Sequence, residues 1–264
     1  MRLTPIIIIA AALALPALAV AATTDLASVL AGPQRSAANK ARDAYRHPAE
    51  TLTFFGLKPT MTVVEISPQG GWYTEILAPY LRDHGHYLAA GTFPGSDNAI
   101  KAVAKFKAKL DADPVTYSKA TVTAFGKGHY AIAPAGSADA VLTFRNIHNF
   151  YIGGYAPEAF KAFYTALKPG GVLGIEEHRL PDDRPDAMQD STGYMKVATV
   201  KRLAAAAGFK FVAASEVNAN QKDRADYPDG VWTLPPTYQL GDKDRAKYAA
   251  IGESDRMTLR FVKP

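Results

Sequence analysis

The feature that most constrains this 264-residue chain is a repeated alternation of short β-rich runs with longer amphipathic helical stretches. The first run, Thr62–Ile66, is bounded by turn residues, and apolar residues from Tyr73 to Tyr80 then follow with helical spacing. Strands separated by helices of this length need right-handed crossovers, so the sequence predicts an α/β fold with a doubly wound, mainly parallel sheet. The further runs interpreted as strands are 86–91, 121–125, 138–144, 172–176, 209–214 and 257–262.

The stretch from Ser36 to Tyr45 is predicted to be one helix, and Pro48 and Glu50 are typical of the first turn of the next, with His47 as its cap. We expect residues 36–56 to form a helical lid. Residues 215–256 are rich in Asp, Asn, Pro and Gly, which predicts a long irregular excursion over one edge or face. No repeat or linker divides residues 23–264, so a single domain is expected there.

The first residues have the pattern of a secretory signal peptide. Met1-Arg2 supplies a positive end, an apolar run extends from Ile6 to Leu18, and small residues follow up to Ala22. A retained N-terminal anchor is the alternative, but the run is short for a spanning helix. We therefore predict cleavage of residues 1–22 and a secreted or periplasmic protein, with no stable membrane insertion after cleavage.

Composition excludes several classes of protein. Apolar residues make up 48% of the chain and charged residues 21%, which suits a large core and excludes disorder, collagen and coiled coil. The chain has no cysteine, so disulfides, thiolate metal sites and a cysteine nucleophile are excluded. The net charge, 30 − 25 = +5, is small and scattered, so no nucleic-acid partner is expected. The oligomeric state is not fixed by the sequence.

The loop after the first strand is the first place to expect a ligand. In an open α/β sheet, ligands bind beyond the carboxyl ends of the strands. Gly70-Gly71 permits a tight turn and a close approach to the backbone, and a helix starting near Trp72 would present free N–H groups. The alternative is that the two glycines only make the turn between strand and helix.

The run from Val63 to Thr74, Val-Val-Glu-Ile-Ser-Pro-Gln-Gly-Gly-Trp-Tyr-Thr, resembles the first motif of the class I S-adenosylmethionine-dependent methyltransferases. Residues 138–144 resemble that family's fourth-strand motif, and residues 167–173 resemble its approach to strand five. More narrowly, residues 43–52, 143–149 and 251–257 resemble a group of exported bacterial methyltransferases.

The resemblance implies a Rossmann-like seven-stranded sheet of order 3-2-1-4-5-7-6 with the last strand antiparallel. It also implies an S-adenosylmethionine-dependent methyltransferase that acts on a small-molecule acceptor. The cofactor would lie along the strand-one loop, with its methionine end near the two glycines and its adenosine end towards the second and third strands. The implied cofactor-binding residues are Glu65, Ser67, Gly70, Gly71, Tyr73, Thr92, Phe125 and Gly126.

The chain departs from the family's pattern in two places. Ser67 and Gln69 stand where the family has glycines, and the segment 89–94 after the second strand lacks the acid that usually holds the ribose hydroxyls. A second hypothesis therefore stays open: an exported, non-catalytic protein that binds a small ligand on a degenerate methyltransferase fold.

Polar clusters after the fourth and fifth strands compete for the reacting role. Arg145, Asn146 and His148 are the predicted catalytic residues, with the imidazole as a general base and Arg145 pairing with an anionic group. The alternative is that His148 only satisfies loop carbonyls. Glu176 ends the fifth strand and Glu177 follows it, and the alternative for Glu177 is a solvated pair with Arg179.

Two further polar clusters and a set of histidines are also candidates for the site. Asp43, Arg46 and His47 precede the first strand, and residues 253–256 precede the last, where they form either a charged pair in the site or a polar turn. His47, His148 and His178 could converge with Glu176 or Glu177 on a metal, but no paired ligand spacing exists, so no metal is predicted. The absence of a G-x-S-x-G elbow argues against a serine hydrolase.

Overall fold

The computed structural model describes residues 25–264, so the predicted signal peptide, residues 1–22, lies outside the described residues. Within the described part, none of the helices combines the length and the apolar character that a membrane crossing requires.

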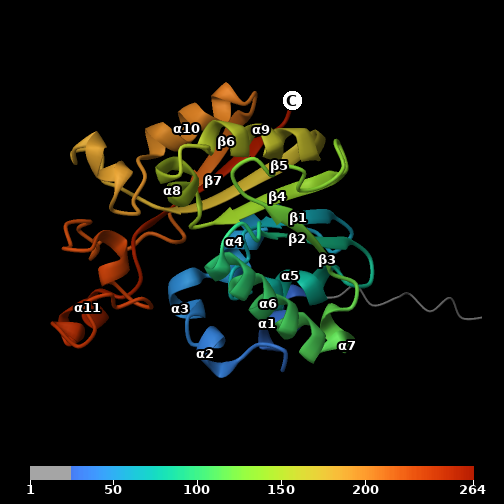
Figure 1. Cartoon of the computed structure of the whole chain (residues 1–264), viewed down its shortest axis with the longest axis horizontal. Coiled ribbons are helices and arrows are strands. Elements are labelled where there is room, and N and C mark those ends of the chain that lie inside the picture. The colour runs from blue at the N-terminus through green and yellow to red at the C-terminus, as the bar shows by residue number, and fades with distance from the viewer. Residues whose placement is uncertain (1–24) are drawn as a thin grey trace, which may run out of the picture.

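A seven-stranded sheet forms the centre of the molecule, in the order β3-β2-β1-β4-β5-β7-β6 (Figure 1). The pairs among β1 to β5 are parallel, and β7 runs antiparallel to both β5 and β6. The predicted fold class and strand order are therefore confirmed. The strands are β1 (Thr62–Ile66), β2 (His86–Thr92), β3 (Thr121–Phe125), β4 (Ala138–Phe144), β5 (Leu167–His178), β6 (Lys210–Ser215) and β7 (Arg256–Val262).

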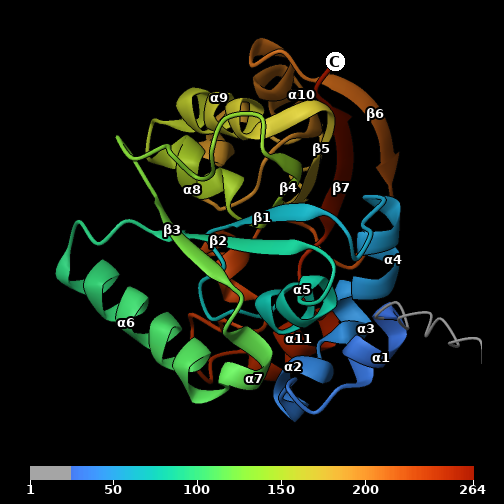
Figure 2. The ribbon, with the colours of Figure 1, turned by 90° about the vertical axis from the view of Figure 1, so that its right-hand side faces the viewer.

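Helices cover both faces of the sheet, as Figure 2 shows most clearly. One face carries α1 (Leu26–Ala31), α2 (Ala37–Lys40), α3 (Asp43–Arg46), α4 (Pro48–Phe54), α5 (Thr74–Leu81), α6 (Asp97–Ala112) and α7 (Pro114–Tyr117). The other carries α8 (Ile147–Ile152), α9 (Ala156–Ala166) and α10 (Val197–Ala206). Two apolar cores lie between the sheet and these two layers of helices, because both faces of a parallel sheet must be buried.

The fifth strand begins earlier than predicted. Residues 168–171, expected to be a turn before the strand, are already part of β5. Leu167 pairs with Ala138 of β4, and a register shift follows before the regular ladder continues. Gly170 has a φ of 77°, which only glycine adopts readily, so the Pro-Gly-Gly sequence makes an irregularity within the strand and does not end the pairing.

The single helix expected from Ser36 to Tyr45 is wrong, because the segment forms two one-turn helices, α2 and α3. Ser36 does cap α2, since its hydroxyl accepts a hydrogen bond from the backbone N–H of Asn39. The break at Ala41 and Arg42 turns the chain. His47 is the N-cap residue of α4, as expected, with a φ of 39°, but it caps through its backbone carbonyl and makes no side-chain capping bond.

The segment between β6 and β7 is mostly irregular, as its composition indicates. It contains a short 3-10 helix, η2 (Gly230–Thr233), and one α-helix, α11 (Arg245–Ile251). Another 3-10 helix, η1 (Asp186–Asp190), follows β5. The chain then returns through Glu253 and Ser254 to β7, whose start lies beside the end of β5, so this return places polar residues at the sheet edge where ligands bind.

Candidate functional site

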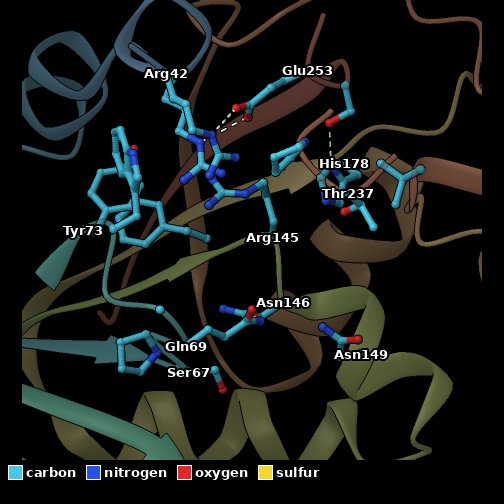
Figure 3. Close-up of a pocket in the computed structure, with 18 of the residues that line it drawn as sticks. Arg42, Ser67, Gln69, Tyr73, Arg145, Asn146, Asn149, His178, Thr237 and Glu253 are labelled. Carbon is cyan, nitrogen blue, oxygen red and sulfur yellow. Dashed lines mark hydrogen bonds and ion pairs between the residues drawn. The ribbon is translucent and has the colours of Figure 1, made fainter. Parts of the chain in front are cut away.

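A cavity of about 500 Å³ opens at the carboxyl ends of β1 and β4. Its walls come from the loops after these two strands, from the helices α2 and α3 with the turn between them, and from residues 231–237 and 253–254 of the return to β7 (Figure 3). Segments more than 200 residues apart in the sequence therefore meet at one site.

Hydrogen bonds join the two strand-end loops to each other. Gln69 donates its amide to the side-chain oxygen of Asn146 (3.0 Å), and Asn146 donates to the backbone carbonyl of Ile66 (3.0 Å). Ser67 and Gln69 both have a φ of 50°, a left-handed conformation that non-glycine residues seldom adopt. The loop thus keeps the backbone shape that glycine usually permits, although two of the expected glycines are replaced.

The two adjacent glycines have different roles. Gly70 lines the cavity, and a Cβ added there would meet nothing within 4 Å. Gly71 has a φ of 76°, and an added Cβ would lie 3.1 Å from Lys109 and 3.3 Å from Phe106 of α6. Gly71 does not line this cavity. It serves the turn and the packing against α6, whereas Gly70 leaves room for a ligand.

Glu65, the acid at the end of β1, lies beneath this loop and is 3% exposed. Its carboxylate accepts hydrogen bonds from Tyr87 (2.6 Å) and Thr74 (3.1 Å). Burial raises the pKa of Glu65 to about 7, against the opposing effect of these hydrogen bonds. The side chain ties β1 to β2 and to α5.

Tyr73 and Arg145, both predicted site residues, contact the same buried carboxylate, Glu176. Tyr73 stacks on Phe144 with ring centroids 3.5 Å apart and donates its hydroxyl to Glu176 (3.2 Å). Arg145 pairs with Glu176 at 2.9 Å, and Arg256 pairs with it at 2.7 Å. Burial raises the pKa of Glu176, but the two guanidinium groups outweigh burial and hold it below its ordinary value. Glu176 is therefore ionised, and its contacts with Tyr73 and Arg145 hold this wall of the cavity in place.

His148 lies in the first turn of α8, a helix that the sequence did not predict. Its Nδ1 is 2.9 Å from the carboxylate of Glu177, whose side chain is fully buried. The same carboxylate accepts the backbone N–H of Ile147 at the start of α8. Because a carboxylate only accepts, Nδ1 carries the proton and Nε2 is left for the cavity that His148 lines.

The solvated pair considered for Glu177 and Arg179 is wrong. Arg179 instead pairs with Asp255 (2.8 Å) and Glu216 (2.8 Å). Nor does Asp43 line the cavity, since it forms a two-hydrogen-bond ion pair with Arg35.

His178 supplies a second imidazole to the cavity. Its Nδ1 is 2.6 Å from the hydroxyl of Ser254. Burial, reinforced by His148, lowers its pKa well below the ordinary value, so it stays neutral. His148, Glu177 and His178 offer ligand atoms within 4.8 Å of one another, the one such group among residues 25–264. The Glu177 oxygens already accept hydrogen bonds from the backbone N–H groups of Ile147 and His178 and from the His148 imidazole, so its place is to orient the His148 ring.

A second cavity, of about 650 Å³, adjoins the first, and Pro68 and Gln69 line both. Thr92 and Gly91, at the end of β2, face it, and apolar residues of α6 form much of its wall. Asp111 is the one carboxylate among the described residues that line it, and it is held by Lys107 at 2.6 Å. The end of β2 therefore supplies no carboxylate to this cavity, in agreement with the sequence of residues 89–94.

Two predicted cofactor residues do not reach either cavity. Phe125 is 2% exposed and belongs to the core. Gly126 packs against Phe93, since an added Cβ would lie 3.1 Å from the Phe93 Cβ. Phe93 in turn stacks on His129 with ring centroids 3.3 Å apart. The end of β3 is thus closed by an aromatic pair.

Comparison with known proteins agrees with this arrangement. No family model and no curated protein sequence matches the chain. A solved S-adenosylmethionine-dependent methyltransferase from Aquifex aeolicus matches with a TM-score of 0.58 and 15% identity, over 91% of this chain and all of that one. The chain has the fold of the class I methyltransferases. The cyclase SpnF also matches, with a TM-score of 0.60, 15% identity and coverage of 90% and 91% of the two chains.

Several cavity residues were not singled out from the sequence. Arg42 and Asn39 come from the N-terminal helical segment, and Trp232 and Thr237 come from the irregular excursion. The polar Glu253-Ser254 pair was considered, with a turn as the alternative, and the structure places both residues at the cavity. The composition of residues 215–256 predicted an irregular excursion over one edge or face of the sheet. It did not indicate which side chains of this segment would face the cavity.

Proposed function

We propose that the chain is an S-adenosylmethionine-dependent methyltransferase that acts on a small acceptor. The observation that carries the proposal is the joining of the β1 and β4 loops around one cavity, which continues past Pro68 and Gln69 into a second. A two-part ligand with a methionine end and an adenosine end fits two adjoining cavities on a fold of this class.

The residues present support this cofactor at its methionine end more than at its ribose. Gly70 leaves open space beside the loop, so a ligand can approach the backbone closely there. At the end of β2 the hydroxyl of Thr92 takes the place of the usual acid. Such a ribose contact is weaker, because hydrogen bonds to a carboxylate are about twice as strong as neutral ones.

When bound, the cofactor supplies an electrophilic methyl group on a sulfonium. The protein's task is mainly to align the acceptor atom with that methyl and to exclude water. His148 is the base in this proposal: its Nδ1–H is held by Glu177, and its Nε2 takes the proton that the acceptor loses. Asn146, fixed by its bond to Ile66, presents its amide at the same wall.

The test is calorimetry of the purified protein with S-adenosylmethionine and S-adenosylhomocysteine. Micromolar binding of both is expected. Gly70→Trp is expected to weaken it at least tenfold, because a side chain there meets no obstacle and occupies the cavity rim. Ala104→Trp, on the exposed face of α6, is the matched control and should bind as the unaltered protein does. Absent or millimolar binding of both ligands by the unaltered protein refutes the proposal.

We further propose that the protein is exported through residues 1–22, on the strength of the charge and apolar pattern alone. Mass spectrometry of the protein from expressing bacteria is expected to find a new N-terminus near residues 19–22. An intact N-terminus in all fractions refutes export by cleavage.

A further inference from the structure

One end of the first cavity collects positive charge. Arg42 and Arg46 each pair with Glu253, at 2.6 and 3.1 Å, and Arg145 and Arg256 pair with Glu176. This ion-pair network therefore contains four guanidinium groups and two carboxylates, 4 − 2 = +2. Buried charge without a partner is costly, so an excess of this kind indicates that something anionic completes the set.

The four arginines differ in how many of their guanidinium nitrogens are already hydrogen-bonded. Arg256 uses all three nitrogens of its guanidinium: it donates to Ser254 and Tyr45 carbonyls and to Glu176, and it contacts Glu253 as well. It does not line the cavity, and it holds the network together from behind.

The other three arginines line the cavity and keep donors unused. Within residues 25–264, Arg42 and Arg46 each donate a side-chain hydrogen bond only through Nε, to Glu253, and Arg145 only through one terminal nitrogen, to Glu176. One terminal nitrogen of Arg42 is fully buried without a partner in this part of the chain. The three side chains are 24%, 5% and 15% exposed, so water replaces few of these bonds.

The three arginines line the same cavity, and the ring of Trp72 holds Arg46 in place there. Arg46 lies over the ring of Trp72 at 4.6 Å, which fixes the plane of its guanidinium. Burial, together with the nearby charge of Arg145, lowers the pKa of Arg46 to about 9, and an anion placed between the two would remove that repulsion. A planar carboxylate suits such a site, since a guanidinium binds it through two parallel hydrogen bonds.

The position of the arginines relates this site to the acceptor. In Figure 3, Arg42 lies beside Glu253 at one end of the drawn pocket, Gln69 of the strand-one loop and Asn146 lie at the other, and Arg145 lies between them. We propose that Arg42, Arg46 and Arg145 bind a carboxylate group of the methyl acceptor, so that the acceptor is a small carboxylic acid. This inference rests on the proposed function, because the strand-one end of the cavity is left to the cofactor.

The experiment is a titration of the protein, saturated with S-adenosylhomocysteine, with benzoate and with its neutral isostere benzamide. Benzoate is expected to bind at least tenfold more tightly. Arg42→Gln should abolish this preference while S-adenosylhomocysteine affinity holds. The loss of one ion pair lowers the melting temperature without unfolding the protein, because Glu253 keeps Arg46 and Arg256 as partners. Arg202→Gln, at an exposed position on α10, is the matched control and should keep the preference.

Two results overturn the inference. One is equal affinity for benzoate and benzamide in the unaltered protein. The other is a loss of S-adenosylmethionine affinity in Arg42→Gln that does not occur with decarboxylated S-adenosylmethionine, which would assign the arginines to the cofactor's own carboxylate. If the proposed function is wrong, S-adenosylhomocysteine does not bind. A titration without S-adenosylhomocysteine then still shows whether the protein prefers benzoate to benzamide.

Discussion

Replacing Glu65 by Gln tests the electrostatics of the strand-one loop directly. Burial raises the pKa of Glu65 from 4.5 to about 7, so between these values the folded protein holds a proton that the unfolded chain releases. Stability must then fall as the pH rises through this window, because the unfolded state binds fewer protons. A shift of about 2.5 units corresponds to a loss of about 3 kcal/mol between pH 4.5 and pH 8.

Glutamine removes the titration but keeps an oxygen that accepts from Tyr87 and Thr74. The measurement is urea unfolding of both proteins from pH 4.5 to 8. The difference in unfolding free energy, Glu65→Gln minus unaltered, is expected to rise by about 3 kcal/mol across this range. His178 has the opposite slope, since its lowered pKa makes stability fall as the pH drops below 6.5, but it is common to both proteins and cancels.

The control is Glu158→Gln, at an exposed position on α9, which removes a carboxylate that does not belong to the strand-one loop and should not reproduce the rise of about 3 kcal/mol. A Glu65→Gln difference that stays flat, or that falls with rising pH, would show that the carboxylate is charged in the folded protein and that the hydrogen bonds from Tyr87 and Thr74 outweigh its burial.

Three further predictions concern the rest of the site. Nitrogen NMR of the His148 imidazole should find the proton on Nδ1, and Glu177→Gln should remove this preference; a proton on Nε2 in the unaltered protein contradicts the proposed base. Arg256→Met should cost about 3–5 kcal/mol in urea unfolding, because it leaves buried carboxylates with fewer partners; a loss below about 1 kcal/mol argues against a buried network. Gly71→Ala should destabilise by about 1–2 kcal/mol in thermal unfolding, because of its positive φ, whereas Gly70→Ala should be neutral; equal losses would show that the two glycines do not differ.

The sheet could be predicted from the sequence because its signals are local. Strands β1, β3 and β4 begin and end at the predicted residues, since each is a short β-rich run with turn residues close by. The β5 boundary failed because the Pro-Gly-Gly signal is read as a turn, whereas pairing of Leu167 with β4 starts the strand before it. Similarly, nothing in the residues after β4 indicated that His148 begins a helix, because the carboxylate that caps α8 comes from Glu177.

The site was only partly predictable, and the reason is the separation of its partners along the chain. The β1 and β4 loops were expected to face one another because parallel strands end at the same edge, and the Gln69–Asn146 bond joins them there. The arginine cluster depends instead on Glu253, which is 211 residues from Arg42. A cluster of charged residues in the sequence shows which side chains carry a charge, but it does not show which distant charged residues they contact.

The same long-range pairs decide how the cavity keeps its shape. Glu253 lies on the return to β7, and two of its three arginine partners lie in the N-terminal helical segment. One buried carboxylate therefore ties together the two parts of the chain that the sequence left least defined. Burial raises the pKa of Glu253, yet Arg46 and Arg256 lower it to about 2, so the carboxylate stays ionised in acid down to about that pH. Because Glu253 and Glu176 already hold the arginines in place, the proposed carboxylate would meet donors that do not need to rearrange, although their excess charge is not yet compensated.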